Sequence, residues 1–184
     1  PSPTDHDERR RAVAEIALRL VADAGIEAVT VRNVAKAAGY STAGVSHYFR
    51  DKRDLLLTYR AAARRAQARF DAALQSADPL LAFLEAILPL APRVGAWCAF
   101  WGSAIADAEF AREQSRRTAY AAERLAELLR TRRRRAGRAP RDAALEARRL
   151  LALAMGIATQ AAFDPKAWPP ARQRRCIADE VAGL

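Results

Sequence analysis

Apolar residues recur at intervals of three and four positions along almost the whole chain of 184 residues. This spacing places them on one face of an α-helix, whereas a half-buried strand would alternate apolar and polar positions, and no such alternation is present. We therefore expect an all-α fold of about nine helices. Beyond the first 51 residues, the predicted helices cover residues 52–78, 80–90, 96–106, 108–134, 141–163 and 170–184.

The segment AVTVRNVAKAAGYSTAGVSHYFRDKRDL, residues 28–55, contains two short apolar stripes separated by a glycine. Thr30 precedes the first stripe, where a hydroxyl side chain can cap a helix, and Gly39 follows it, where the chain can leave the helix in a left-handed conformation. Ser41 or Thr42 can cap the second helix. Small residues let two such helices cross closely at a steep angle, so the segment predicts a helix-turn-helix.

The second helix is predicted to extend through Phe49, and its outward face carries only small or polar side chains. Such a face can approach the floor of a DNA groove, while hydroxyl and basic side chains around it hold phosphates. An ordinary three-helix packing unit is the alternative. The outward positions are Thr42, Ala43, Gly44, Ser46 and His47, and the candidate phosphate ligands are Thr30, Arg32, Ser41, His47, Tyr48 and Lys52.

The stretch from RRAVAEIALRLVADAG to HYFRDKRDLL resembles the N-terminal domain of the TetR family of bacterial transcriptional regulators. The shared features are an amphipathic first helix ending in a glycine, a T-V-R-x-V-A start, a G-x-S turn and an H-Y-F-x-x-K-x-x-L stretch. Ser46 stands where many members carry a tyrosine, which leaves Tyr48 as the main aromatic phosphate ligand. The resemblance implies that Thr42, Ala43 and Gly44 face base edges and that Thr30, Arg32, Ser41, Ser46, His47, Tyr48 and Lys52 hold phosphates.

The formal net charge of +10 favours association with nucleic acid, but its distribution does not single out this motif. Residues 1–65 carry a net charge of +4 and residues 66–184 a net charge of +6. Six arginines lie in RTRRRRAGR, residues 130–138, which we interpret as a solvated helix end and loop, a secondary contact with the DNA backbone being the alternative. Residues 1–10 are polar with two prolines and predict a flexible arm.

The pattern divides the chain into residues 1–52, an N-terminal arm with a helix-turn-helix DNA-binding domain, and residues 53–184, a helical effector-binding and dimerisation domain. The last two predicted helices carry apolar stripes, and Gly156 permits close approach of another helix. We expect a two-fold, four-helix dimer interface, with an intrachain core as the alternative. The predicted interface residues are Leu150, Leu153, Ala154, Ile157, Ala161, Ile177 and Val181.

The sequence WCAFW at residues 97–101 places two tryptophans on one face of a helix. These rings are either core filler or the wall of a cavity that binds a small molecule. A carboxylate beside aromatic rings would favour a cationic amine. The predicted ligand-binding residues are Trp97, Phe100, Trp101, Phe110, Glu113 and Tyr120.

The C-terminal region also resembles a known group of proteins. The W-x-x-F-W group, the stretch from Arg117 to Tyr120 and the sequence GIATQAAFDPKAWPPARQ resemble the C-terminal domain of the BetI-type repressors, over residues 80–184. Together the two resemblances imply a cytoplasmic, ligand-responsive regulator, a repressor by default, that binds a palindromic double-stranded DNA operator as a homodimer. The founding members of this branch respond to choline, so choline is one candidate effector.

Two other classes of protein are alternatives to a regulator. An enzyme has little support, because the chain has only two histidines, His6 and His47, and no Glu-x-x-His pair or glycine-rich phosphate loop. We therefore expect no catalytic residues, metal site or cofactor. A helical small-molecule-binding or scaffolding protein that has lost operator binding is the second alternative. Cys98 and Cys176 lack metal or redox spacing, which fits reduced thiols, and no stretch is apolar enough to span a membrane.

Overall fold

The computed structural model describes residues 3–48, 67–88, 94–139 and 142–184. All regular structure in these ranges is helical, which confirms the predicted all-α fold. Residues 67–73 are helical in addition to the labelled elements. These elements are α1 (Pro3–Ala24), the 3-10 helix η1 (Ile26–Ala28), α2 (Val31–Ala38), α3 (Thr42–Ser46), α5 (Pro79–Ile87), α6 (Val94–Ala106), α7 (Ala108–Arg135), α8 (Ala143–Phe163) and α9 (Pro170–Ala182).

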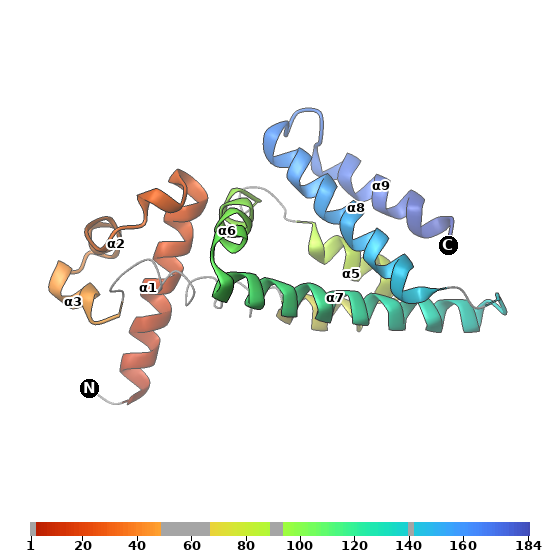
Figure 1. Ribbon diagram of the computed structural model, residues 1–184, viewed down its shortest axis with the longest axis horizontal. Coiled ribbons are helices and arrows are strands. Elements are labelled where there is room, and N and C mark those ends of the chain that lie inside the picture. The colour runs from red at the N-terminus through yellow and green to blue at the C-terminus, as the bar shows by residue number, and fades with distance from the viewer. Residues whose placement is uncertain (1–2, 49–66, 89–93, 140–141) are drawn as a thin grey trace.

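The helices form two groups that are joined through α6 and α7 (Figure 1). The N-terminal group consists of α1, α2 and α3, at the left of Figure 1, and the C-terminal group consists of α5, α8 and α9 around the long helix α7. α6 lies between the groups and contacts α1, α7 and α8. Within the described ranges, every helix is too short or too polar to span a lipid bilayer.

The first helix replaces the predicted flexible arm. α1 begins at Pro3, so the expectation of a flexible segment over residues 1–10 is wrong from residue 3 onward. Proline is tolerated there because the first N–H groups of a helix have no intrahelical partner. The buried positions Val13, Ala17 and Val21 recur every four residues and attach α1 to the core. α1 also carries the exposed side chains of Arg9, Arg10 and Arg11.

One apolar core holds the N-terminal group and continues into α6 and α7. Val34 of α2 and Val45 of α3 are fully buried in it. Phe100 of α6 and Phe110 of α7 belong to the same cluster, with ring centroids 6.5 Å apart. The predicted division between residues 52 and 53 falls outside the described ranges, and this shared core shows that α6 and α7 pack against the N-terminal group.

The C-terminal group has its own core. Phe83 of α5, Leu125 and Leu129 of α7, and Ile177 of α9 are completely or almost completely buried there. Phe70, in the helical segment 67–73, stacks on Phe83 with centroids 4.7 Å apart, and so attaches that segment to α5. Tight packing of such large side chains fixes the relative positions of the helices.

Aspartates begin three of the C-terminal helices. The side chains of Asp78, Asp107 and Asp142 accept hydrogen bonds from the backbone N–H groups of Leu81, Phe110 and Leu145 at 3.1, 3.1 and 3.0 Å. Each carboxylate satisfies a donor that the helix cannot, and its charge is favourable at the positive end of the helix dipole. The predicted starts of the last five helices lie within a few residues of the starts that the structure shows.

The arginine run at residues 130–138 is partly structural, which corrects its interpretation as a solvated helix end. Arg133 is buried, and its Nη2 donates to both carboxylate oxygens of Glu146 on α8, at 2.8 and 3.0 Å. Arg132 donates to the backbone carbonyl of Val181 on α9 at 3.3 Å. The end of α7 is thus tied to α8 and α9. The exposed members of the run are Arg130, Arg134, Arg135 and Arg138.

Replacing Phe100 with alanine tests the shared core. Phe100 is 1% exposed, so Phe100→Ala should lower the free energy of unfolding by about 3–5 kcal/mol through lost burial and the cavity left behind. Ile105→Ala is the control because this isoleucine is 90% exposed, and it should cost less than about 1 kcal/mol. Urea denaturation followed by circular dichroism measures both, and equal losses would contradict the shared core.

Candidate functional site

Local hydrogen bonds define α2 and the turn after it. The hydroxyl of Thr30 accepts a hydrogen bond from the backbone N–H of Asn33 at 3.1 Å, which confirms the predicted cap. Gly39 ends the helix with φ 68°, in the left-handed conformation that glycine adopts without Cβ strain. The N–H of Tyr40 then reaches back to the carbonyl of Ala35 at 3.0 Å, as in a Schellman ending. The turn of the helix-turn-helix therefore lies where the sequence predicts it.

The cap of α3 is Ser41, one of the two predicted possibilities. Its hydroxyl accepts a hydrogen bond from the N–H of Gly44 at 3.1 Å. A Cβ on Gly44 would lie 3.2 Å from that hydroxyl oxygen, so a larger residue would crowd the cap. α3 ends at Ser46, which is shorter than predicted, while Phe49 lies outside the described residues. The second helix of the motif is thus short and fixed mainly by its cap and by buried Val45.

The outward face of α3 is exposed as predicted. Thr42, Ala43, Ser46 and His47 are exposed, whereas Gly44 is half-buried. Ser46 differs from the others because its hydroxyl donates to the carbonyl of Thr42 at 2.8 Å, so this proton is already used inside the helix. The described face can approach another molecule closely, since no long side chain projects from its first turn.

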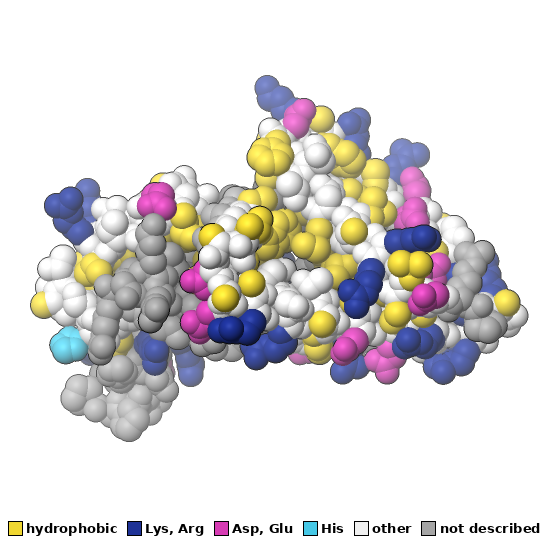
Figure 2. Space-filling model, viewed as in Figure 1, with side chains coloured by type: hydrophobic (Ala, Val, Ile, Leu, Met, Phe, Trp, Pro, Cys, Tyr) yellow, Lys and Arg dark blue, Asp and Glu magenta, His cyan; other side chains and the backbone are white. Residues whose placement is uncertain are grey.

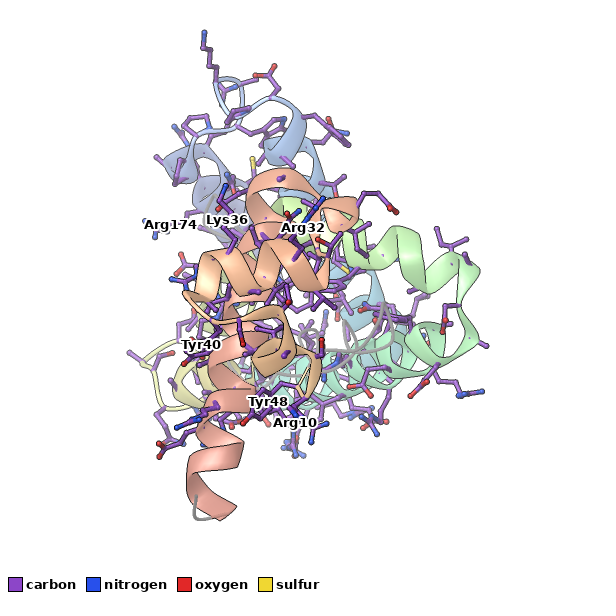
Figure 3. All side chains as sticks on the ribbon, turned by 90° about the vertical axis from the view of Figure 1, so that its left-hand side faces the viewer. Arg10, Arg32, Lys36, Tyr40, Tyr48 and Arg174 are labelled. Atoms are coloured by element: carbon purple, nitrogen blue, oxygen red, sulfur yellow. The ribbon has the colours of Figure 1, made fainter. Side chains whose placement is uncertain are left out.

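Basic and hydroxyl side chains gather around that face. Figure 3 looks onto this end of the molecule and shows Arg32, Lys36, Tyr40 and Tyr48 around the motif, with Arg10 of α1 projecting toward the same end. Of the predicted phosphate ligands, Thr30, Arg32, Ser41 and His47 are exposed, Tyr48 is half-buried, and Lys52 lies outside the described residues. Polar and basic side chains thus surround the motif, and groups of this kind can bind the phosphates of a nucleic-acid backbone.

Three members of this surface were not predicted from the sequence. Arg10 was assigned to a flexible arm, yet it extends from a regular helix. Lys36 is exposed in the last turn of α2, and Tyr40, in the turn, leaves 46% of its surface exposed. The signal in the sequence was the position of Tyr40 between the helix-ending Gly39 and the cap Ser41, because residues in such turns lie at the protein surface.

Two of the six residues predicted to line a ligand pocket lie in the apolar core. Phe100 and Phe110 are buried in the core shared with α1 and are core residues, as the alternative interpretation held. Trp97 and Trp101 are half-buried, and Trp97 packs against the same cluster. The Nε1 of Trp101 is buried and has no hydrogen-bond partner within the described part of the chain. Of the six predicted residues, Trp97, Trp101 and Tyr120 are half-buried and retain surface that a ligand could contact.

Glu113 and Tyr120 already have partners in the protein. Glu113 is 5% exposed and forms ion pairs with Arg116 and Arg117, so its negative charge is compensated and is not free to attract an amine. Burial alone would raise the pKa of the Glu113 carboxyl, but the hydrogen bonds and charges of these arginines outweigh it and lower that pKa below its usual value. The Tyr120 hydroxyl accepts a hydrogen bond from Gln67 at 2.6 Å.

A cavity of about 280 Å³ lies elsewhere, between residues 67–73, α5 and α9. Its lining combines alanine and leucine side chains with charged and amide groups. No local sequence pattern indicates this cavity, because its walls come from three segments that are far apart along the chain. The lining residues are Arg69, Ala73, Ala82, Glu85, Ala86, Leu88, Pro170, Gln173 and Arg174.

The predicted dimer-interface residues divide into two groups. Leu153 is 37% exposed, but the other six are buried within the chain and have the intrachain role that was the alternative. A side chain already covered by its own helices offers little area to a partner. These six residues are Leu150, Ala154, Ile157, Ala161, Ile177 and Val181.

Comparison with known proteins establishes the class. The capped helices α2 and α3 form a helix-turn-helix, and the helices that follow form the C-terminal group. A model of the tetR family of bacterial regulatory proteins matches residues 14–59, and a model of the C-terminal domain of BetI-type transcriptional repressors matches residues 76–184. The chain therefore belongs to the TetR family and has a BetI-type C-terminal domain.

Individual relatives agree with this assignment. The transcriptional regulator BetI of Rhizobium meliloti is 33% identical over 105 residues, which cover 52% of this chain and 52% of BetI. PksA of Bacillus subtilis is 39% identical over 56 residues, 30% of this chain and 27% of PksA. The chain thus spans about half the length or less of these curated relatives. A regulator structure from Saccharomonospora viridis in complex with choline has a TM-score of 0.84, 24% identity and 96% coverage of both chains, and it supports the fold.

The charge network of Glu113 predicts a pH-dependent contribution to stability. A carboxyl whose folded pKa lies below its unfolded value of about 4.5 stabilises the fold above that pH, and loses this contribution as the pH falls through the folded pKa. Glu113→Gln should therefore cost about 1–3 kcal/mol at pH 7 and progressively less below pH 4.5. Urea denaturation from pH 7 to pH 3 measures this, with exposed Glu123→Gln as the control. A pH-independent cost would contradict the assignment.

Proposed function

We propose that the protein is a ligand-responsive transcription repressor that binds a palindromic operator as a homodimer. The observation that carries the proposal is α3 itself, a short helix capped by Ser41 whose exposed face is small and polar and whose surroundings are basic. A helix that only filled a core would not be left uncovered on this face. The family supports the same function, and a protein that acts on the chromosome of a bacterium works in the cytoplasm.

On DNA, α3 enters the major groove with Thr42, Ala43 and Gly44 toward the base edges. The Thr42 hydroxyl can donate to or accept from a base, and the Ala43 methyl can contact the methyl group of thymine. Arg32, Lys36 and Arg10 lie where they can neutralise phosphates, and the Tyr48 hydroxyl can donate to another. Base contacts of this kind specify sequence, whereas the cations supply most of the affinity and make it dependent on salt.

Dimerisation brings two such faces into register with one side of the duplex. Recognition helices that enter successive major grooves must be about 34–36 Å apart, so the dimer geometry decides whether both can bind. An effector needs only to bind better to a state with a different separation, because coupling equals its differential affinity for the two states. Repression is then relieved when the effector is bound.

We assign the dimer contact to the exposed face of α8. Leu145, Leu153 and Phe163 are 47%, 37% and 77% exposed on this face, and Gly156 has open space where a side chain would project. Figure 2 shows hydrophobic side chains along this side of the molecule, over α8 and its junction with α7. Helical spacing places on one stripe Leu145, Arg149, Ala152, Leu153, Gly156, Gln160 and Phe163.

A cationic amine such as choline remains a candidate effector. Its support is the pair of half-buried indole rings, Trp97 and Trp101, since indole faces attract quaternary ammonium groups, and the choline complex of the Saccharomonospora viridis regulator. The contribution first expected of Glu113 is not part of this proposal, because its charge is compensated by two arginines. An amine at the indole rings would adjoin the core that links α6 to α1.

Removing two of the proposed phosphate ligands tests the DNA interface. The double variant Arg10→Ala with Arg32→Ala should weaken binding to every duplex and reduce the slope of log affinity against log salt by about 2 per chain, because two counterions fewer are released. Fluorescence anisotropy with duplexes from upstream of its own gene and with a scrambled duplex, at several salt concentrations, measures both effects.

Arg148→Ala, which removes an exposed arginine of α8, is the matched control and should leave the slope unchanged. Binding of wild-type protein that is equal for all sequences would indicate the alternative of a relative that no longer reads an operator. Salt slopes that are identical for the double variant and the control would contradict the placement of the DNA interface.

A charge on the exposed stripe of α8 tests the dimer contact. Leu153→Glu should convert dimer to monomer at micromolar concentration, because a carboxylate would be buried without a partner in an apolar interface. Ile105→Glu is the matched control, since Ile105 is 90% exposed at the end of α6 and away from the stripe. Light scattering after size exclusion measures the mass, and a dimeric Leu153→Glu variant would rule out this face.

A further inference from the structure

The cavity between residues 67–73, α5 and α9 is separate from the aromatic group of α6. Its volume of about 280 Å³ corresponds to roughly nine water molecules, which places it at the lower end of the range for ligand sites. Alanine side chains of the segment 67–73 and of α5, with Leu88, make part of its wall apolar. The size and lining fit a small molecule with a short apolar side chain.

Charges of both signs line the same cavity. Arg69 projects from the segment 67–73, Glu85 from α5 and Arg174 from α9. Neither Glu85 nor Arg174 forms an ion pair within the described part of the chain, although both line one cavity. Figure 3 shows Arg174 extending outward from the ribbon at the edge of the molecule. Two guanidinium groups and one carboxylate therefore line the space without an ion pair between Glu85 and Arg174.

A buried amide completes the α9 wall. Gln173 is 5% exposed, and its Nε2 donates to the backbone carbonyl of Trp168 at 2.8 Å. This hydrogen bond fixes the side chain, so the amide contributes a rigid polar surface to the cavity. This part of the wall lowers the entropic cost of binding, because the Gln173 side chain need not be ordered when the ligand enters.

We propose that this cavity binds a small zwitterion, a free α-amino acid with an apolar side chain. Its carboxylate would lie at Arg174, its ammonium group at Glu85 and its side chain against the alanines. A ligand with only a carboxylate would be repelled by Glu85, and a ligand with only an ammonium group would be repelled by Arg174. Selectivity thus comes from repulsion as well as attraction.

An occupant would connect three segments that are far apart along the chain. Residues 67–73 and α5 pack through Phe70 and Phe83, and α9 packs against α5. A bound zwitterion would add contacts between all three and so favour the arrangement in which they are closest. That such binding changes operator affinity rests on the proposed function, whereas the binding itself does not.

The test begins with the twenty common L-amino acids, each added to the full-length protein in a thermal-shift assay. At least one with an apolar side chain should raise the melting temperature by several degrees, since a ligand that binds only the folded state stabilises it. Calorimetry then compares that amino acid with its decarboxylated amine and its deaminated acid, for example L-leucine with 3-methylbutylamine and 4-methylpentanoate. Both analogues should bind at least about tenfold more weakly.

Substitutions in the cavity test the roles assigned to its charged side chains. Arg174→Gln should weaken amino-acid binding about tenfold or more. Glu85→Gln should weaken it similarly but strengthen binding of the deaminated acid, because the repulsion is removed. Arg175→Gln is the matched control on α9, as this exposed arginine has only a 3.9 Å ion pair with Asp179, and it should bind as the wild type does.

Absence of a thermal shift with all twenty amino acids, or variants that bind like the wild type, would overturn the inference. Operator binding is measured separately on the same protein by anisotropy without ligand. A protein that binds operator but no amino acid contradicts only the cavity assignment, and one that binds amino acid but no operator contradicts only the proposed function.

Discussion

The packing of Phe100 and Phe110 against α1 is the contact on which the rest of the structure depends. The N-terminal group alone buries mainly valines and alanines, such as Val13, Val34 and Ala35, and a small unit with such a core is marginally stable. Two aromatic rings from α6 and α7 supply the missing volume. The position of the helix-turn-helix therefore depends on α6 and α7. A shift of either helix must also shift α1.

The surface proposed to contact DNA is shaped by local interactions of the backbone. Gly39 turns the chain, Thr30 and Ser41 cap the two helices, and Val45 anchors α3 in the core. These contacts do not involve the side chains of Thr42 and Ala43, which are exposed. Substitutions at Thr42 or Ala43 can therefore alter sequence preference with little effect on stability, because exposed positions seldom contribute much to it.

The elements that the sequence predicts well are those set by neighbours in the chain. Thr30 and Gly39 act on residues three or four positions away, and aspartates such as Asp107 begin their own helices. Contacts between distant helices are different, because an apolar pattern identifies Phe100 as buried but not what covers it. Glu113 looks like an available charge until its two arginines are placed, and Arg133 meets Glu146 only because α7 and α8 pack together. The cavity needs three segments at once, which no local pattern can indicate.

α7 is 28 residues long, so a small rotation at its anchored end moves its other end far. At a rise of 1.5 Å per residue the helix is about 42 Å long, with Phe110 in the core beside α1 at one end and Arg132 and Arg133 tied to α9 and α8 at the other. A lever of that length turns a tilt of about 5° into a displacement of about 4 Å at its far end. In the proposed two-fold dimer the displacements of the two subunits add, and the separation of the two N-terminal groups changes by roughly twice that distance. Few atoms need to move at the anchored end for the proposed dimer to lose its fit to two successive grooves.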